Sequence, residues 1–153
     1  MFVGEAEQFD DITMLCVRLN KVENMKITTI PTMETMTEVA DFVEEQLEKF
    51  EVPMKYTTKL LVAVDEIYSN IVRYSGATEA SVCIEKESNT VKLTFKDNGK
   101  PYNPLAAEDP DVTASAEERK IGGLGIFMVR KMMDDIDYMH KDDQNILTLT
   151  LNI

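Results

Sequence analysis

The sequence predicts an α/β sandwich in which a mixed, mostly antiparallel sheet is covered by helices on one face. The chain has 153 residues, which is enough for one domain with a single core and too few for two full-sized domains. Apolar residues make up 44% and charged residues 29%, a balance typical of globular proteins. Predicted strands and helices follow an order in which hairpins outnumber crossovers, which favours antiparallel pairing.

Two strand-like stretches separated by a linker open the chain. Residues 12–19 are rich in apolar and β-favouring side chains and follow an acidic pair, so they predict a strand. Residues 20–25 are expected to form a short linker. Residues 26–30 predict a second strand, which Pro31 ends.

Two helices are expected next. In residues 33–50, apolar side chains recur at spacings of three and four, as on the buried face of an amphipathic helix. Thr32 or Thr35 is expected to cap its start. Residues 55–76 predict a second helix, which Gly76 ends. Its expected buried stripe consists of Leu61, Val64, Tyr68, Ile71 and Val72.

The C-terminal half predicts two hairpins separated by a long loop and a helix. Residues 80–87 and 90–97 alternate in polarity and predict the first hairpin. Residues 100–120 contain several prolines and acids, and loops of this length are usually lids or binding loops. Residues 122–136 predict a third helix that opens with glycines, and residues 136–153 predict two closing strands.

Composition and charge argue against several classes of function. The formal net charge of −12 disfavours nucleic-acid binding, because affinity for phosphate backbones comes mainly from lysine and arginine. The longest apolar runs are far shorter than the ~20 residues that span a bilayer, so we expect no membrane partner and a soluble, cytosolic protein. Cys16, Cys83 and His140 show no metal-ligand spacing, and neither a zinc site nor a disulfide scaffold is expected.

Three polar side chains are spaced by four and three on the second predicted helix. Glu66, Asn70 and Arg73 therefore share a helical face beside the apolar stripe. The pattern fits a solvated polar face. It also fits a site in which the amide oxygen of Asn70 binds Mg²⁺ together with phosphates and water, and Glu66 takes a proton from an attacking hydroxyl.

The stretch FKDNGKPYNP, residues 95–104, places a carboxylate at the end of a predicted strand. Asp97 fits a simple turn former beside Asn98 and Gly99. It also fits a ligand site, since a carboxylate accepts a hydrogen bond from an exocyclic amine and would select adenine over guanine, while Gly99 lets a flat ring approach the backbone. We expect Tyr102 to pack within the following loop rather than to line such a site.

Glycines open the third predicted helix in the stretch KIGGLGIF, residues 120–127. Flexible backbone N–H groups at the positive end of a helix dipole bind anions. The pattern lacks both the dinucleotide-binding glycine fingerprint and the lysine of the P-loop, and it also fits a hinge before a helix. Taken in chain order, the three polar clusters nevertheless describe one coherent nucleotide site.

Four motifs together resemble the Bergerat-fold (GHKL) ATPases, and within them the bacterial anti-sigma-factor serine/threonine kinases. The stretch DEIYSN is similar to the N box of that family, and DNGKPYNP and GGLGIFMVRKMMD are similar to its two glycine boxes. The closing strand NILTLTL also matches. The resemblance covers about residues 25–153 and implies the Bergerat fold.

The resemblance implies a role for each matching residue. Asn70 would hold Mg²⁺ on the triphosphate of ATP, Glu66 would be the general base, and Asp97 would read the adenine amine. The glycines that would shape the pocket and its lid are Gly99, Gly123 and Gly125. The other candidate nucleotide-binding residues are Arg73, Pro101, Lys120, Gly122 and Leu124.

Two positions distinguish this chain within that family. Histidine kinases and gyrase-like members usually carry a second glycine where this chain has Pro101, and the proline is similar to the anti-sigma kinase branch. In that branch an arginine often precedes the second glycine run. Here Ile121 occupies that position, and Arg119 and Lys120 come just before it. The sequence therefore does not identify which cationic side chain, if any, would contact the terminal phosphate.

Residues 1–20 resemble the last metal-ligand segment and final strand of bacterial metal-dependent protein serine phosphatases. In such a phosphatase Asp10 would help to bind the metals, and the chain would be the C-terminal part of a larger switch protein. An unrelated added strand fits the stretch as well. The expected division is therefore a phosphatase-like strand at 1–20 and an ATP-binding kinase domain at 25–153.

The function implied by the resemblance is that of an ATP- and Mg²⁺-dependent protein serine/threonine kinase. Its substrate would be a small antagonist protein in a partner-switching pathway, with a sigma factor as a further candidate partner and a homodimer as the candidate assembly. The alternative is a non-catalytic, ATP-gated protein-binding module that regulates a fused phosphatase.

Overall fold

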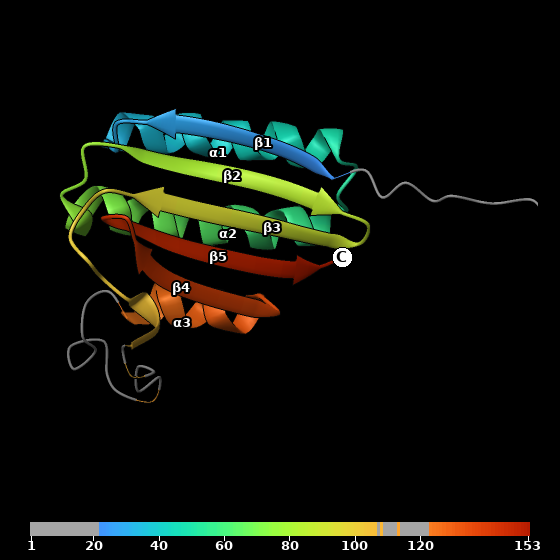
Figure 1. Ribbon diagram of the computed structural model, residues 1–153. Helices are drawn as coiled ribbons and strands as arrows, with labels where there is room; N and C mark the ends of the chain where they lie inside the picture. The colour runs from blue at the N-terminus through green and yellow to red at the C-terminus, as the bar shows by residue number, and fades with distance from the viewer. Residues whose placement is uncertain (1–21, 107, 109–112, 114–122) are drawn as a thin grey trace, which may run out of the picture.

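The structure is a computed structural model that describes residues 22–106, 108, 113 and 123–153. Within these residues, one five-stranded sheet carries a layer of helices on one face (Figure 1). In chain order the elements are β1 (Glu23–Thr29), α1 (Met33–Lys49), α2 (Met54–Asn70), η2 (Ile71–Ser75), β2 (Ala80–Glu87), β3 (Thr90–Asp97), η3 (Pro104–Ala106), α3 (Gly123–Met132), β4 (Asp135–Lys141) and β5 (Gln144–Asn152). The predicted two-layer α/β sandwich is confirmed.

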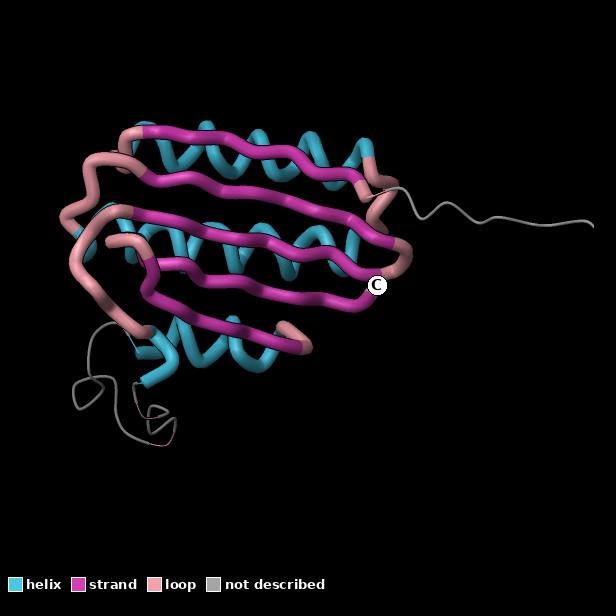
Figure 2. Tube along the Cα trace, viewed as in Figure 1, coloured by secondary structure: helices cyan, strands magenta, loops and turns pink. Residues whose placement is uncertain are grey.

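The sheet has the strand order β1-β2-β3-β5-β4, and Figure 2 shows these strands side by side. All four pairings between these strands are antiparallel. We expected a mixed, mostly antiparallel sheet, and the described sheet is instead entirely antiparallel. The reason is that β5 enters the sheet between β3 and β4. A strand inserted there runs opposite to both neighbours. β3 and β4 therefore run in the same direction without pairing with each other, and α3 forms the crossover between them.

The first strand is longer than its sequence indicates. Residues 23–25, expected to be part of a linker, belong to β1, and Glu23 pairs with Lys86 of β2. Backbone pairing with β2 thus extends over residues 23–25, and it outweighs the low strand propensity of Glu23 and Asn24. The strand predicted at residues 12–19 lies outside the described part of the chain.

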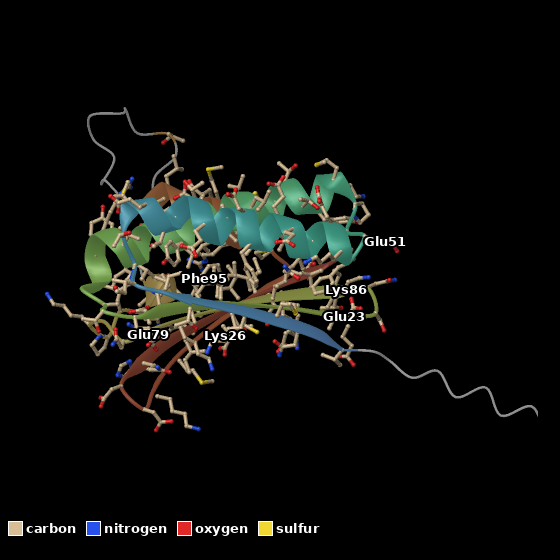
Figure 3. The ribbon with its side chains drawn as sticks, turned by 90° about the horizontal axis from the view of Figure 1, so that it is seen from above. Glu23, Lys26, Glu51, Glu79, Lys86 and Phe95 are labelled. Carbon is tan, nitrogen blue, oxygen red and sulfur yellow. The ribbon has the colours of Figure 1, made fainter. Side chains whose placement is uncertain are left out.

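The core lies between the two layers, and Figure 3 shows Phe95 of β3 between the helices and the sheet. Alternate residues of β2, β3 and β5 point into it, as in a sheet with one covered face. Of the expected buried stripe, Val64 and Tyr68 of α2 and Ile71 of η2 are buried, whereas Leu61 of α2 and Val72 of η2 are only partly buried. Because α2 packs against both α1 and α3, its buried face is wider and also takes in Leu60, Ala63 and Ile67.

The end of the second helix is confirmed at Gly76, which has a φ of +66°. A residue with a positive φ ends a helix, and glycine adopts this conformation without steric cost. The last turn, η2, is a π-helix rather than an α-helix. Among the described residues, no helix combines the length and the hydropathy that a membrane span requires.

The predicted cap of the first helix is also confirmed. Thr35 N donates to Thr32 Oγ1 at 3.3 Å, and Thr32 N donates to Thr35 Oγ1 at 2.9 Å, which together form a capping box. Thr35 Oγ1 additionally hydrogen bonds with the hydroxyl of the buried Tyr68 of α2. The start of α1 is thereby fixed on the core.

We expect Thr32→Ala to lower the free energy of unfolding by about 1 kcal/mol, because the backbone N–H of Thr35 at the start of α1 loses its acceptor. The control is Thr37→Ala, an exposed position inside the same helix, where alanine is the better helix former and the stability should not fall. Urea unfolding of the two variants measures the difference. Equal losses in both would contradict the cap.

Candidate functional site

A cavity of about 230 Å³ opens where β3 ends, between the helix layer and the sheet. Its wall is built by α2, η2, β3, the loop after β3, α3 and the two closing strands. Most of the wall is apolar, and its polar groups include Asn70, Asp97, Lys100 and Asn145. An apolar cavity with a few convergent polar groups is the usual form of a small-molecule site.

Asp97 is the last residue of β3 and is 6% exposed. Gly99 N donates to its Oδ1 at 2.9 Å, and Asn145 Nδ2 donates to the same oxygen at 3.1 Å. Both of these hydrogen bonds engage Oδ1, which leaves Oδ2 to accept a hydrogen bond from a ligand. Asp97 thus lines the cavity wall, as the predicted contact with a base would require.

The loop after β3 packs closely against η2. Lys100 N donates to Ser75 O at 2.9 Å. A Cβ at Gly99 would overlap Ser75 O and lie 2.7 Å from Ser75 Cβ and 2.8 Å from Asp97 Oδ1. Gly99 is thus required for the contact with Ser75, a role that its motif did not indicate.

The residues after Gly99 follow the cavity wall. Lys100, Pro101 and Tyr102 all line it, and Tyr102 is 57% exposed. The expectation that Tyr102 only packs within the loop is wrong. Tyr102 N donates to Asn145 Oδ1 at 3.1 Å, so the backbone anchors this residue at the cavity wall.

The three polar candidates of the second predicted helix lie in different surroundings. Asn70 lines the cavity, whereas Glu66, one turn earlier, is partly buried against α3. Arg73 is exposed and lies outside the cavity wall, contrary to the expected shared face. Arg73 belongs to η2, and each residue of that wider turn advances less around the axis than the ~100° of an α-helix, so it leaves the face of Asn70.

The start of α3 lies beside Glu66. A Cβ at Gly125 would overlap the carboxylate oxygen Glu66 Oε2. The absence of a side chain at this position lets the carboxylate reach the N-terminal turn of α3, where the helix dipole favours negative charge. Gly123 begins α3 and Leu124 is 40% exposed. The candidates Lys120 and Gly122 lie outside the described residues.

Asn145 is the functional candidate that the sequence analysis missed. Its side chain is 6% exposed and links Asp97, Lys100, Tyr102 and Tyr138. A signal was present, because inward-facing positions of the last strand alternate with period two and Asn145 is the polar member of that series. A polar residue at a core-facing position indicates a structural or functional partner.

Other titratable groups do not form a competing site in the described part of the chain. No group of three or more histidine, cysteine, aspartate or glutamate side chains is placed to hold a metal ion there. Cys83 is a free thiol whose pKa is raised by burial and, to a smaller extent, by the nearby Glu85 carboxylate. Neither observation supports zinc binding or thiol chemistry in these residues.

Gly99 and Gly125 both lie close to other atoms, but Gly99 faces rigid backbone and Gly125 faces a flexible side chain. Alanine substitutions at the two positions should therefore differ in their effect on stability. We expect Gly99→Ala to destabilise the protein by about 1–3 kcal/mol, because the new methyl group meets the backbone of Ser75. The matched change Gly125→Ala meets only the end of the Glu66 side chain, and alanine favours the helix. Its stability should stay within about 1 kcal/mol of the original, as measured by urea unfolding. The reverse order of stabilities would refute this account.

Known proteins share both the sequence pattern and the fold. The histidine kinase-like ATPase domain family matches residues 30–151. The serine/threonine-protein kinase BtrW of Bordetella bronchiseptica is 32% identical over 95 residues, which cover 60% of this chain and 67% of BtrW. The serine-protein kinase RsbW of Listeria monocytogenes is 25% identical over 96 residues, which cover 58% of this chain and 61% of RsbW. The chain thus spans about three fifths of the length of RsbW.

Two solved structures have the same fold. The RsbU and RsbW domains of a Mycobacterium tuberculosis protein superpose with a TM-score of 0.63 at 17% identity, covering 85% of this chain and 32% of that one. The SiaB–SiaC complex of Pseudomonas aeruginosa gives a TM-score of 0.59 at 12% identity, covering 84% and 88%. At these identities the two structures show the fold alone. With a family match over residues 30–151 and the fold described above, the chain belongs to the histidine kinase-like ATPase domain family.

Proposed function

We propose that this protein is an ATP-dependent protein serine/threonine kinase of the anti-sigma-factor type, which phosphorylates a small antagonist protein in a partner-switching pathway. The names of BtrW and RsbW as serine kinases support this activity. The observation that carries it is the cavity at the end of β3, where the buried Asp97 and the partly exposed Asn70 both line the wall beside the Glu66–Gly125 contact. The proposal places the reaction in the cytoplasm, because ATP is a cytoplasmic metabolite.

The base of ATP would enter the apolar part of the cavity. Asp97 Oδ2 accepts the hydrogen bond of the adenine amine, whereas guanine presents an acceptor oxygen at that position and is disfavoured. Buried polar groups that match one ligand and are left unpaired by another discriminate strongly between them. Pro101 and Tyr102 flank this part of the cavity.

The triphosphate would then extend toward the start of α3. Backbone N–H groups at a helix N-terminus attract phosphate, and Gly123 begins that helix. Lys100 is a cation of the cavity wall and is available to the same phosphates. The roles proposed for Lys120 and Gly122 rest on the family resemblance, and the exposed Arg73 would act only at the rim.

Magnesium fits the residues present. Asn70 offers one amide oxygen at the cavity, and Mg²⁺ is commonly held by one or two protein oxygens together with phosphates and water. When bound, the ion would neutralise phosphate charge that develops during transfer. The described residues offer no carboxylate cluster that would hold the ion without a nucleotide.

Transfer would depend mainly on positioning and electrostatics. The hydroxyl oxygen of a serine or threonine in the partner forms a bond to the γ-phosphorus. The bond from that phosphorus to the β–γ bridging oxygen breaks, and ADP leaves with the electron pair. Glu66 accepts the hydroxyl proton, so it acts as the general base.

The resemblance to the anti-sigma-factor kinases also implies further partners. We extend the proposal to a sigma factor as a second partner and to a homodimer. The phosphatase-like origin of residues 1–20 remains a prediction, since these residues lie outside the described structure.

Phosphate transfer from γ-labelled ATP and Mg²⁺ into a lysate of the source organism tests the activity. We expect the wild type to label a small protein on serine or threonine. Glu66→Gln should lower labelling by about 100-fold or more while ATP still binds, because only the proton acceptor is lost. Asn70→Ala should weaken ATP binding in the presence of Mg²⁺. The matched control is Glu44→Gln on the exposed face of α1, which should label normally.

The same assay separates the kinase from the ATP-gated module. If Glu66→Gln transfers phosphate as well as the wild type, Glu66 is not the base and the proposed mechanism is lost. If the wild type binds ATP by calorimetry but labels nothing, the non-catalytic module is the better account. Gly125→Ala gives an independent check, since it should keep the fold and still reduce labelling by displacing the Glu66 carboxylate.

A further inference from the structure

The Asn145 side chain uses all four of its hydrogen-bonding positions inside the cavity wall. Its Nδ2 donates to Asp97 Oδ1 at 3.1 Å and to Lys100 O at 2.8 Å. Its Oδ1 accepts from Tyr102 N at 3.1 Å and from the Tyr138 hydroxyl at 2.6 Å. An asparagine amide has two donor hydrogens and two acceptor lone pairs, so no capacity remains for a further partner.

The partners fix the orientation of this amide. Lys100 contributes a backbone carbonyl, which can only accept, and Tyr102 contributes a backbone N–H, which can only donate. A flipped amide would place oxygen against oxygen and N–H against N–H. The NH₂ group of Asn145 therefore faces Asp97.

Asn145 joins two parts of the site that are separate in sequence. It lies directly opposite Asp97 in the β3–β5 ladder, 48 residues away along the chain. Through Lys100 and Tyr102 it also holds the first residues of the loop that follows β3. One side chain thus sets the Asp97 carboxylate and the adjacent cavity wall in the same geometry.

We propose that Asn145 is a positioning residue that makes the cavity selective for adenine. The inference rests on the proposed nucleotide function and deepens it. By donating to Oδ1, Asn145 directs Oδ2 of Asp97 toward the ligand as the acceptor for the base. A carboxylate free to rotate would present either oxygen, and water would compete at both.

Side chains of similar or smaller size do not reproduce this arrangement. Aspartate has the same size but lacks the two donor hydrogens and places a second carboxylate beside Asp97. Serine and threonine carry only one donor hydrogen. Replacement at this position should therefore alter base recognition in addition to stability, and that difference makes the proposal testable.

The test measures the affinities of ATP and GTP by calorimetry in the presence of Mg²⁺. The proteins are the wild type, Asn145→Asp, Asn145→Ala and the control Leu151→Ala, which removes a buried side chain of the same strand near its far end. Thermal unfolding of each protein reports the loss of stability. Asn145→Asp preserves side-chain volume and leaves no cavity, so it provides a second variant if the alanine variant unfolds.

We expect both Asn145 variants to bind ATP about tenfold or more weakly and to lose most of their preference for ATP over GTP. Leu151→Ala should lower the unfolding temperature yet keep the ATP-to-GTP affinity ratio within about twofold of the wild type. This split between stability and selectivity is what a purely structural role would not produce.

The outcomes that overturn the inference are distinct from those that overturn the function. If the wild type prefers ATP and a folded Asn145 variant keeps the same ratio, the positioning role is refuted and the kinase proposal stands. If Leu151→Ala loses the ratio to the same extent, selectivity follows general stability and the inference is again refuted. A wild type that binds neither nucleotide refutes both proposals together.

Discussion

The register between β3 and β5 is the constraint on which the site depends. It pairs Asp97 with Asn145 at one end of the ladder and Leu93 with Leu149 in the core. A shift of one residue would turn both sets of side chains to the uncovered face of the sheet. Burial of the leucines therefore holds the polar pair in place, and the hydrophobic effect, which is not directional, specifies a directional hydrogen bond.

A second constraint comes from the helix layer. The Glu66 carboxylate lies against α3 because residue 125 has no side chain, so the glycine acts here through space rather than through backbone flexibility. The positive end of the α3 dipole favours the carboxylate, and it would favour phosphate in the same region. Positive charge from Lys100 and from a bound cation would limit the repulsion between these anions. The overall charge of −12 does not describe this local field.

Asn70 and Arg73 show that α-helical spacing predicts which side chains share a face only while the helix remains an α-helix. Asn70 is the last residue of α2, and its position relative to Glu66 follows the α-helical repeat. Arg73 comes after the change to η2, where the repeat no longer holds. The interruption in turn lets Ser75 meet the loop after β3, where its carbonyl receives Lys100 N. The turn that moves Arg73 away from the cavity thus helps to close the cavity wall.

The sequence by itself determined the features that depend on local patterns. Apolar periodicity located the helices and hairpins, Thr32 and Gly76 marked helix ends, and the Asp97 and Asn70 motifs pointed to residues that do line the cavity. Only the tertiary structure decided which of them meet. The Asn145 network, the contact of Gly99 with Ser75 and the place of Tyr102 arise between segments far apart in the chain. No local spacing encodes such contacts, because they exist only after the sheet register and helix packing are fixed.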